Sequence, residues 1–123
     1  MLDKIREQSA KAKNYPDLVS KLIEIGVESY TVEVSTGIIL YRFANGMNAI
    51  HQQDKVARKT EDLFSTELTV KAIRDNQQGK TTFPVFMDGI AKAGVQFYEA
   101  TLVGVKRVTY IGVGGSYEEN IPI

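Results

Sequence analysis

The pattern of apolar and polar positions occurs twice along the chain. Residues 2–34 align with residues 70–102 at a constant offset of 68, without a gap. Six aligned positions carry the same residue: Ile5/Ile73, Arg6/Arg74, Pro16/Pro84, Gly26/Gly94, Val27/Val95 and Tyr30/Tyr98. One inserted residue then shifts the offset to 69, where Tyr41 matches Tyr110. Because the identities fall at turn, cap and core positions, we interpret the sequence as an internal duplication.

Each copy opens with two predicted helices. Residues Leu2–Gln8 are rich in helix formers and predict a short helix. Its counterpart is longer, since Ser65 is a good N-cap and Gly79 lies just beyond the last periodic position. The second helices follow the candidate N-caps Asn14 and Thr82, each with a proline in the first turn, where proline is tolerated.

The second helices carry apolar residues at i, i+4 and i+7, namely Leu18, Leu22 and Ile25 in one copy and Phe86, Ile90 and Ala93 in the other. Gly26 and Gly94 end these helices, and we expect both to have positive φ. After each glycine the period changes to two, which predicts strands. The expected strands are 30–34, 38–43 and 47–50, then 98–102, 107–111 and 116–119. Asn45-Gly46 and Gly114-Gly115 predict two-residue hairpin turns.

The predicted fold class is therefore α+β. It is an internal duplication of a helix–helix–β-hairpin(-strand) unit, with a mainly antiparallel sheet packed against helices in pseudo-two-fold symmetry. Repeat 1 spans about 2–50 and repeat 2 about 65–121, joined by a polar connector, 51–64, that has room for one helical turn. One half alone leaves a sheet face and both helix stripes uncovered, so we expect 1–123 to form a single domain with a shared core.

Composition narrows the function classes. Fifteen basic and fifteen acidic residues give no net charge, so we do not expect a nucleic-acid partner. The chain has no cysteine, which removes disulfides, thiolate metal sites and cysteine nucleophiles. The charged N-terminus has no apolar signal-peptide core, and no apolar run approaches the roughly 18 residues that span a bilayer. We expect a cytoplasmic protein without a membrane partner.

The motifs that suggest catalysis have simpler explanations. Gly79-Lys80-Thr81 resembles the end of a phosphate-binding loop, but Arg74 stands where that loop needs a glycine and a helix precedes it. His51 is the only histidine, so a metal site would have to be completed by carboxylates. We interpret it as an exposed histidine at a strand end. The sequence therefore predicts no catalytic residue, no metal ligand and no cofactor.

The tyrosines are more informative. Four of them occupy equivalent sheet positions in the two copies, namely Tyr30, Tyr41, Tyr98 and Tyr110. Core packing with satisfied hydroxyls is the simpler interpretation, and a sheet face that stacks a ligand or partner is the alternative. Arg42, Lys106 and Arg107 are close in sequence, as in an RNA-stacking sheet, but the zero net charge and the absence of an aromatic RNP-like run argue against RNA.

The second copy also resembles a known family. The resemblance rests on residues 77–86 (QQGKTTFPVF) and 91–95 (AKAGV), with Tyr110, Glu119 and Ile121-Pro122 further on. These match the YbcV-like family, uncharacterised bacterial and prophage proteins with a domain of unknown function, sometimes labelled "phage envelope protein". About 45 residues match closely. Asn76 stands where the family pattern has a histidine, so no role of that histidine carries over. The resemblance implies a phage-related bacterial context and no activity.

Two functional hypotheses remain. The leading one is a small non-enzymatic protein that binds a protein partner, or itself as a homodimer, through tyrosines and exposed sheet edges. The alternative is a small-ligand-binding protein or enzyme that uses a cleft between the two halves. Lys80, Tyr98, Arg107 and Tyr110 are the candidate binding residues. A deep pocket lined by these groups favours the alternative, and a flat tyrosine-bearing surface favours the first.

Overall fold

The computed structural model describes residues 2–52 and 57–121, which begin with a pair of helices. Helix α1 covers Leu2–Lys11 and helix α2 covers Tyr15–Glu24. Asn14 caps α2, since its side chain accepts a hydrogen bond from the backbone N–H of Asp17 at 2.9 Å. Helix α1 is three residues longer than predicted. A Glu7–Lys11 ion pair of 3.0 Å, spaced i to i+4, supports this additional turn.

The second helix pair repeats this arrangement. Helix α3 covers Thr66–Gln77 and helix α4 covers Phe83–Lys92. The Ser65 hydroxyl accepts a hydrogen bond from the Leu68 N–H at 3.2 Å, as its N-cap position predicts. Thr82 occupies the N-cap position of α4, but its side chain makes no capping hydrogen bond. Gly26 and Gly94 both have positive φ, at 93° and 83°, which confirms that they end the second helices.

The strands are β1 (Val27–Glu33), β2 (Ile38–Phe43), β3 (Asn48–Gln52), β4 (Val95–Thr101), β5 (Arg107–Gly112) and β6 (Gly115–Asn120). They form one antiparallel sheet in the order β3-β2-β1-β4-β5-β6. The predicted duplication and α+β class are thereby confirmed. Strands β1 and β4 start three residues earlier than predicted. A bulge after Val27 and another after Val95 interrupt the period of two there.

The two halves meet at the centre of the sheet, where β1 pairs with β4. Thr31 lies opposite Glu99, which is its own equivalent in the repeat, and Val32 lies opposite Tyr98. A pseudo-two-fold axis must pass through the Thr31–Glu99 pair, because only there does a residue face its counterpart. The sheet is therefore continuous across the duplication.

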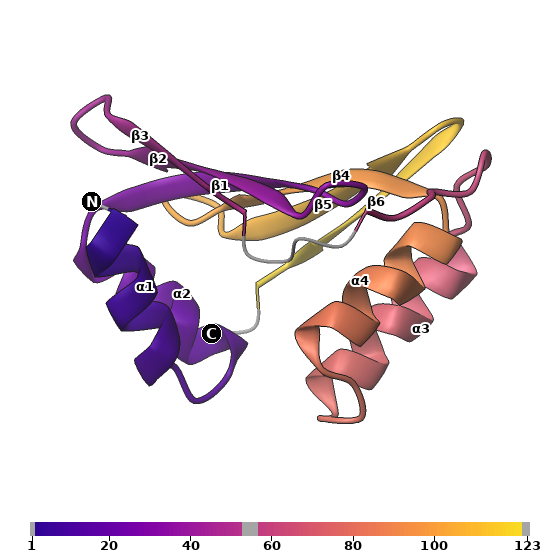
Figure 1. Cartoon of the computed structure of the whole chain (residues 1–123), viewed down its shortest axis with the longest axis horizontal. Helices are drawn as coiled ribbons and strands as arrows, with labels where there is room; N and C mark the ends of the chain where they lie inside the picture. Colours follow the sequence, from indigo (N-terminus) through magenta and orange to yellow (C-terminus); the bar gives the residue numbers. More distant parts are fainter. Residues whose placement is uncertain (1, 53–56, 122–123) are drawn as a thin grey trace.

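Both helix pairs cover the same face of the sheet, and none of the described residues forms a helix over the other face, which we call the uncovered face (Figure 1). Helix α2 packs on β1 and α1 on β3, while α4 packs on β4 and α3 on β6. Helices α2 and α4 point fully enclosed side chains toward the sheet: Val19 and Leu22 on α2, and Met87 and Ile90 on α4. The pairs stand at opposite ends of the sheet, so the middle of this face lies between them. No helix in residues 2–52 or 57–121 is long and apolar enough to cross a membrane.

The connector and the turns differ from their predictions. His51 belongs to β3 opposite Ile39 and is half-buried, so it is not the exposed strand-end residue expected. Residues 57–64 contain no helical turn, and residues 53–56 lie outside the described parts. Residues 57–64 are instead held by backbone hydrogen bonds, such as that from Phe64 N to Val113 O at 3.1 Å. The first hairpin has a three-residue loop, because Phe43 N bonds Met47 O. The second hairpin has the two-residue loop Val113-Gly114, one residue before the predicted Gly114-Gly115.

Candidate functional site

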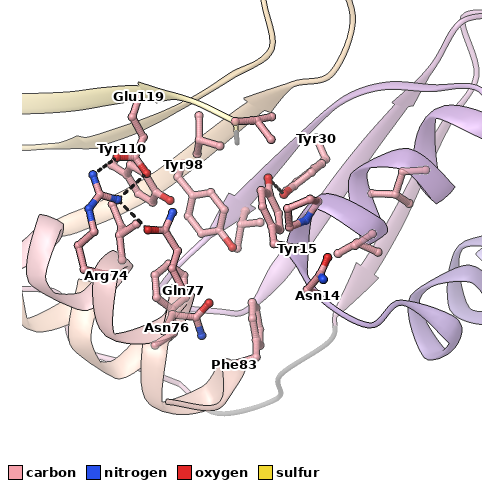
Figure 2. Close-up of a pocket in the computed structure, with 18 of the residues that line it drawn as sticks. Asn14, Tyr15, Tyr30, Arg74, Asn76, Gln77, Phe83, Tyr98, Tyr110 and Glu119 are labelled. Carbon is pink, nitrogen blue, oxygen red and sulfur yellow. Dashed lines mark hydrogen bonds and ion pairs between the residues drawn. The ribbon is translucent and has the colours of Figure 1, made fainter. Parts of the chain in front are cut away.

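A cavity of about 1050 Å³ lies between the two helix pairs, with the sheet as its floor. It is lined by every tyrosine in the chain: Tyr15, Tyr30, Tyr41, Tyr98, Tyr110 and Tyr117. Figure 2 shows side chains entering it from both helix pairs and from the sheet. A cavity of this size accommodates a drug-sized molecule. Since both halves contribute to its walls, the cavity depends on the duplication.

The sheet supplies a floor of tyrosine rings. The ring centroids of Tyr98 and Tyr110 lie 5.2 Å apart on β4 and β5, and those of Tyr30 and Tyr41 lie 5.8 Å apart on β1 and β2. Tyr117 on β6 continues the row, with its ring stacked at 6.5 Å from that of Tyr110. The four equivalent tyrosines are only 5–6% exposed. They belong to the buried core and also line the cavity, and the stacking of a ligand on them stays a prediction.

The tyrosine hydroxyls are not equally engaged. The hydroxyls of Tyr15 and Tyr30 are hydrogen-bonded to each other at 2.7 Å. The Tyr117 hydroxyl donates to Glu119 Oε2 at 2.8 Å. The remaining three, on Tyr41, Tyr98 and Tyr110, have no hydrogen-bond partner among the described residues. No fully enclosed side-chain nitrogen or oxygen in those residues lacks a partner, so these three hydroxyls keep an accessible side. All three residues line the cavity, and Tyr41 also lines a second, smaller one.

A single substitution between the repeats explains why Tyr98 differs from Tyr30. Tyr15 holds the hydroxyl of Tyr30, and the equivalents of these two residues are Phe83 and Tyr98. Phenylalanine has no hydroxyl, so the bond cannot form in the second half. Tyr98 instead packs edge-to-face on the ring of Phe86, at a centroid distance of 6.2 Å. The two halves therefore differ in the hydrogen bonding of one central tyrosine hydroxyl.

One end of the cavity carries a polar corner (Figure 2). Arg74 on α3 reaches β6 and donates to both carboxylate oxygens of Glu119, at 2.8 and 3.2 Å. Gln77 Oε1 accepts a further hydrogen bond from Arg74 at 2.9 Å. The two charges therefore neutralise each other at the cavity wall. This bidentate pair fixes the position of α3 relative to the last strand.

The surroundings of these groups shift their pKa values. Burial raises the pKa of Tyr15 and of Tyr41 to about 12. Burial also holds the pKa values of Tyr30, Tyr98 and Tyr110 well above the usual value of 10.0. For Glu119, burial raises the pKa, but the hydrogen bonds from Arg74 and Tyr117 outweigh it and leave the pKa below 4.5. Near neutral pH the cavity therefore offers neutral phenols and one paired carboxylate.

The first repeat has its own, separate version of the polar corner. A small cavity of about 170 Å³ is lined by Ile5, Arg6, Ser9, Tyr41 and His51. Their equivalents in the second repeat all line the large cavity: Ile73, Arg74, Gln77, Tyr110 and, by strand register, Glu119. The large cavity consequently has a polar corner at the second-repeat end. A molecule bound there would meet different chemistry at its two ends.

The four candidate residues from the sequence fall in different places. Tyr98 and Tyr110 line the cavity. Lys80 is exposed in the turn between α3 and α4, outside the lining. Arg107 lies on the uncovered face of the sheet, where it donates to Glu118 at 3.5 Å. Arg42 shares that face and bonds the Thr31 hydroxyl at 2.9 Å, so these basic side chains lie opposite the tyrosine floor.

Sequence reasoning missed Tyr15, Arg74, Tyr117 and Glu119. A signal existed for Tyr117 and Glu119, since alternate residues of one strand face the same side. Arg74 and Glu119 are 45 residues apart, and nothing in the sequence pairs them. The described residues contain no group of three or more histidine, cysteine, aspartate or glutamate side chains that could hold a metal ion.

Fold and cavity together define a class: a small α+β protein whose two pseudo-symmetric halves enclose a tyrosine-lined cavity. Residues 3–116 match the family model described as "Protein of unknown function (DUF1398)". The match covers most of the chain, so the protein belongs to the DUF1398 family. No curated protein matches the sequence.

Proposed function

We propose that this protein binds a small organic molecule in the cavity between its two halves. The observation that carries the proposal is the lining: a cavity of about 1050 Å³ that gathers all six tyrosines. Three of their hydroxyls have no hydrogen-bond partner among the described residues. Large apolar cavities with a few convergent polar groups are the usual form of small-molecule sites. A ligand would supply the hydrogen bonds that these hydroxyls lack.

A fragment screen with a cavity-filling variant tests this function. The probe is a library of small aromatic and aliphatic fragments, observed through the amide resonances of the labelled protein. We expect hits to shift the resonances of Tyr98 and Tyr110. Leu18 lines the cavity, so Leu18→Trp should fill it and abolish binding. Val85→Trp on the same helix layer is the control, because Val85 is 50% exposed and outside the lining.

The outcomes separate clearly. Binding by wild type and Val85→Trp, but not by a folded Leu18→Trp, supports the proposal. A library in which no fragment binds wild type with a Kd below about 1 mM would contradict it. So would hits whose resonance shifts lie on the uncovered face of the sheet.

A second candidate function is partner binding on that uncovered face. Ile50 is 67% exposed there, opposite Leu40, and Ile38 on the same face is 38% exposed. Adjacent apolar residues on an open sheet suit a protein partner or a second copy of the chain. Sedimentation equilibrium tests the homodimer: wild type should associate with increasing concentration and Ile50→Lys should not. A wild type that stays monomeric excludes the homodimer.

The origin of the protein and its place of action are also proposals. We infer a bacterial, prophage-related origin of the YbcV-like type and a cytoplasmic place of action. These rest on the resemblance of residues 77–95 and on the lack of cysteine. The fragment experiment does not depend on them.

A further inference from the structure

The walls of the cavity are flat aromatic surfaces. Tyr98, Tyr110 and Tyr117 form a continuous row, with interplanar angles of 34° and 26° between neighbours. Tyr15 and Phe83, the first residues of α2 and α4, border the same cavity (Figure 2). Aromatic rings pack best against other rings, in offset-stacked or edge-to-face contacts. A planar aromatic molecule therefore fits these walls better than a saturated one.

The charge of the lining indicates an uncharged ligand. The charged residues among those that line the cavity are Lys13, Arg74 and Glu119. Arg74 and Glu119 hold each other at 2.8 Å, and Lys13 is exposed at the rim. A cation entering the cavity would find no carboxylate without a partner, and an anion would find no enclosed cation without one. Moving a charged ligand out of water would be costly under these conditions.

The accessible hydroxyls indicate a hydrogen-bonding group on that ligand. Tyr98 and Tyr110 are adjacent, and each hydroxyl can donate one hydrogen bond and accept others. Tyr98 lacks a partner because Phe83 stands in the place of Tyr15, so its hydroxyl is the polar atom that the broken symmetry leaves for a ligand. A carbonyl or amide group would accept from one phenol and, as an amide, donate to another.

We propose that the ligand is an uncharged planar aromatic molecule with a carbonyl or amide group, and that the Tyr98 and Tyr110 hydroxyls bind this group. This inference rests on the proposed function and specifies the chemistry of the same site. The polar corner at Arg74 and Glu119 makes the two ends of the cavity different. The molecule is therefore held in one orientation.

Calorimetric titration with four probes of similar size tests the ligand class. Isoquinolinone is the uncharged planar amide, N-methylquinolinium the cation, naphthoate the anion, and the decahydro lactam the saturated analogue. We expect isoquinolinone to bind at least about tenfold more tightly than the other three. Tighter binding of N-methylquinolinium would indicate a cation cage and overturn the inference. Equal binding of all four, or binding of the saturated lactam alone, would overturn it as well.

Two phenylalanine variants test the hydroxyls. Tyr98→Phe should weaken isoquinolinone binding by about five- to tenfold, since one hydrogen bond is lost. Tyr30→Phe is the matched control at the equivalent position, and its hydroxyl is already held by Tyr15. Tyr30→Phe should therefore weaken isoquinolinone binding less than Tyr98→Phe does. Equal effects of the two variants would contradict the role assigned to Tyr98. Tyr110→Phe repeats the affinity measurement for the second hydroxyl that the proposal assigns to the ligand.

The failures of the two proposals can be told apart. If the fragment library contains no molecule that binds, the proposed function is wrong. If other fragments occupy the cavity while isoquinolinone does not bind wild type, the cavity is a binding site and the ligand class is wrong. Circular dichroism establishes that each variant is folded before its affinity is compared.

Discussion

The hydroxyl oxygens of Tyr15 and Tyr30 lie 2.7 Å apart, and this bond has no counterpart in the second half of the chain. Phe83 and Tyr98 occupy the equivalent positions, so one hydroxyl of a symmetric pair is engaged and the other is accessible. A duplicated fold first produces two equal half-sites. The absence of a hydroxyl on Phe83 makes them unequal, and the polar corner of Arg74 and Glu119 at one end adds a second difference.

The same pair predicts unequal effects on stability. Tyr30→Phe removes a part-buried hydrogen bond and should lower the free energy of unfolding by about 1 kcal/mol. Tyr98→Phe removes a hydroxyl without a partner among the described residues, so it should change that free energy by less than about 0.5 kcal/mol. Chemical denaturation of the two variants measures this difference. Equal losses would show that the Tyr98 hydroxyl is engaged in the folded protein.

The two helix-ending glycines should tolerate alanine differently. Both need positive φ, which costs a residue with a β-carbon roughly 1 kcal/mol. At Gly26 the nearest atom to an added β-carbon is a Phe43 ring carbon at 4.0 Å, so Gly26→Ala should cost only this amount. At Gly94 an added β-carbon would clash with the Leu63 carbonyl, whose carbon lies 2.7 Å away. Gly94→Ala should therefore cost about 3 kcal/mol.

Thermal unfolding of both glycine variants checks this prediction. Gly46→Ala is a useful control, because Gly46 has a φ of 82° and no atom within 4 Å of an added β-carbon. It should behave like Gly26→Ala. A Gly94→Ala protein as stable as Gly26→Ala would mean that the connector moves away from the helix end at little cost.

Glu119 should contribute stability that depends on pH. Its pKa in the folded protein is below the ordinary 4.5, because hydrogen bonds from Arg74 and Tyr117 outweigh the effect of burial. A carboxylate with a lowered pKa stabilises the fold above 4.5, and that contribution disappears as the pH falls through the lower folded value. Wild type should exceed Glu119→Gln in stability near neutral pH, and the difference should vanish in acid. Urea denaturation across this pH range measures it, and a constant difference would contradict the shift.

The tyrosines should ionise late on alkaline titration. The pKa of every tyrosine is raised, to about 12 for Tyr15 and Tyr41. The main cause is the hydrogen bond to Glu119 for Tyr117 and burial for the other tyrosines. A phenol with a raised pKa stabilises the fold below its unfolded pKa of 10.0, and this contribution is lost as the pH rises above that value. Phenolate absorbance should stay low at about pH 11 in the folded protein and be nearly complete in concentrated guanidinium chloride. Ionisation near 10.0 in the folded state would show that the cavity is open to bulk water.

Local pattern was sufficient for the fold and insufficient for the site. Helix caps such as Ser65 and helix ends such as Gly94 depend on neighbours in sequence, and they were predicted correctly. The β1 bulge and the long α1 were missed, because a bulge hides the period of two and side-chain pairs extend a helix beyond its apolar stripe. The cavity required knowing that both helix pairs cover one face of a continuous sheet. That follows from the pairing of β1 with β4, which brings together residues about 70 positions apart.

This central pairing also predicts that the halves do not fold separately. Cutting within residues 53–56 and expressing either half alone would leave β1 or β4 as an open edge. The central tyrosine floor, including Tyr30 and Tyr98, would also lose its neighbours from the other half. Each fragment should therefore be unfolded or aggregated, and co-expression should restore a folded complex. Circular dichroism and size-exclusion chromatography provide the measurement, and a monomeric fragment with a cooperative melt would show that each half has a sufficient core of its own.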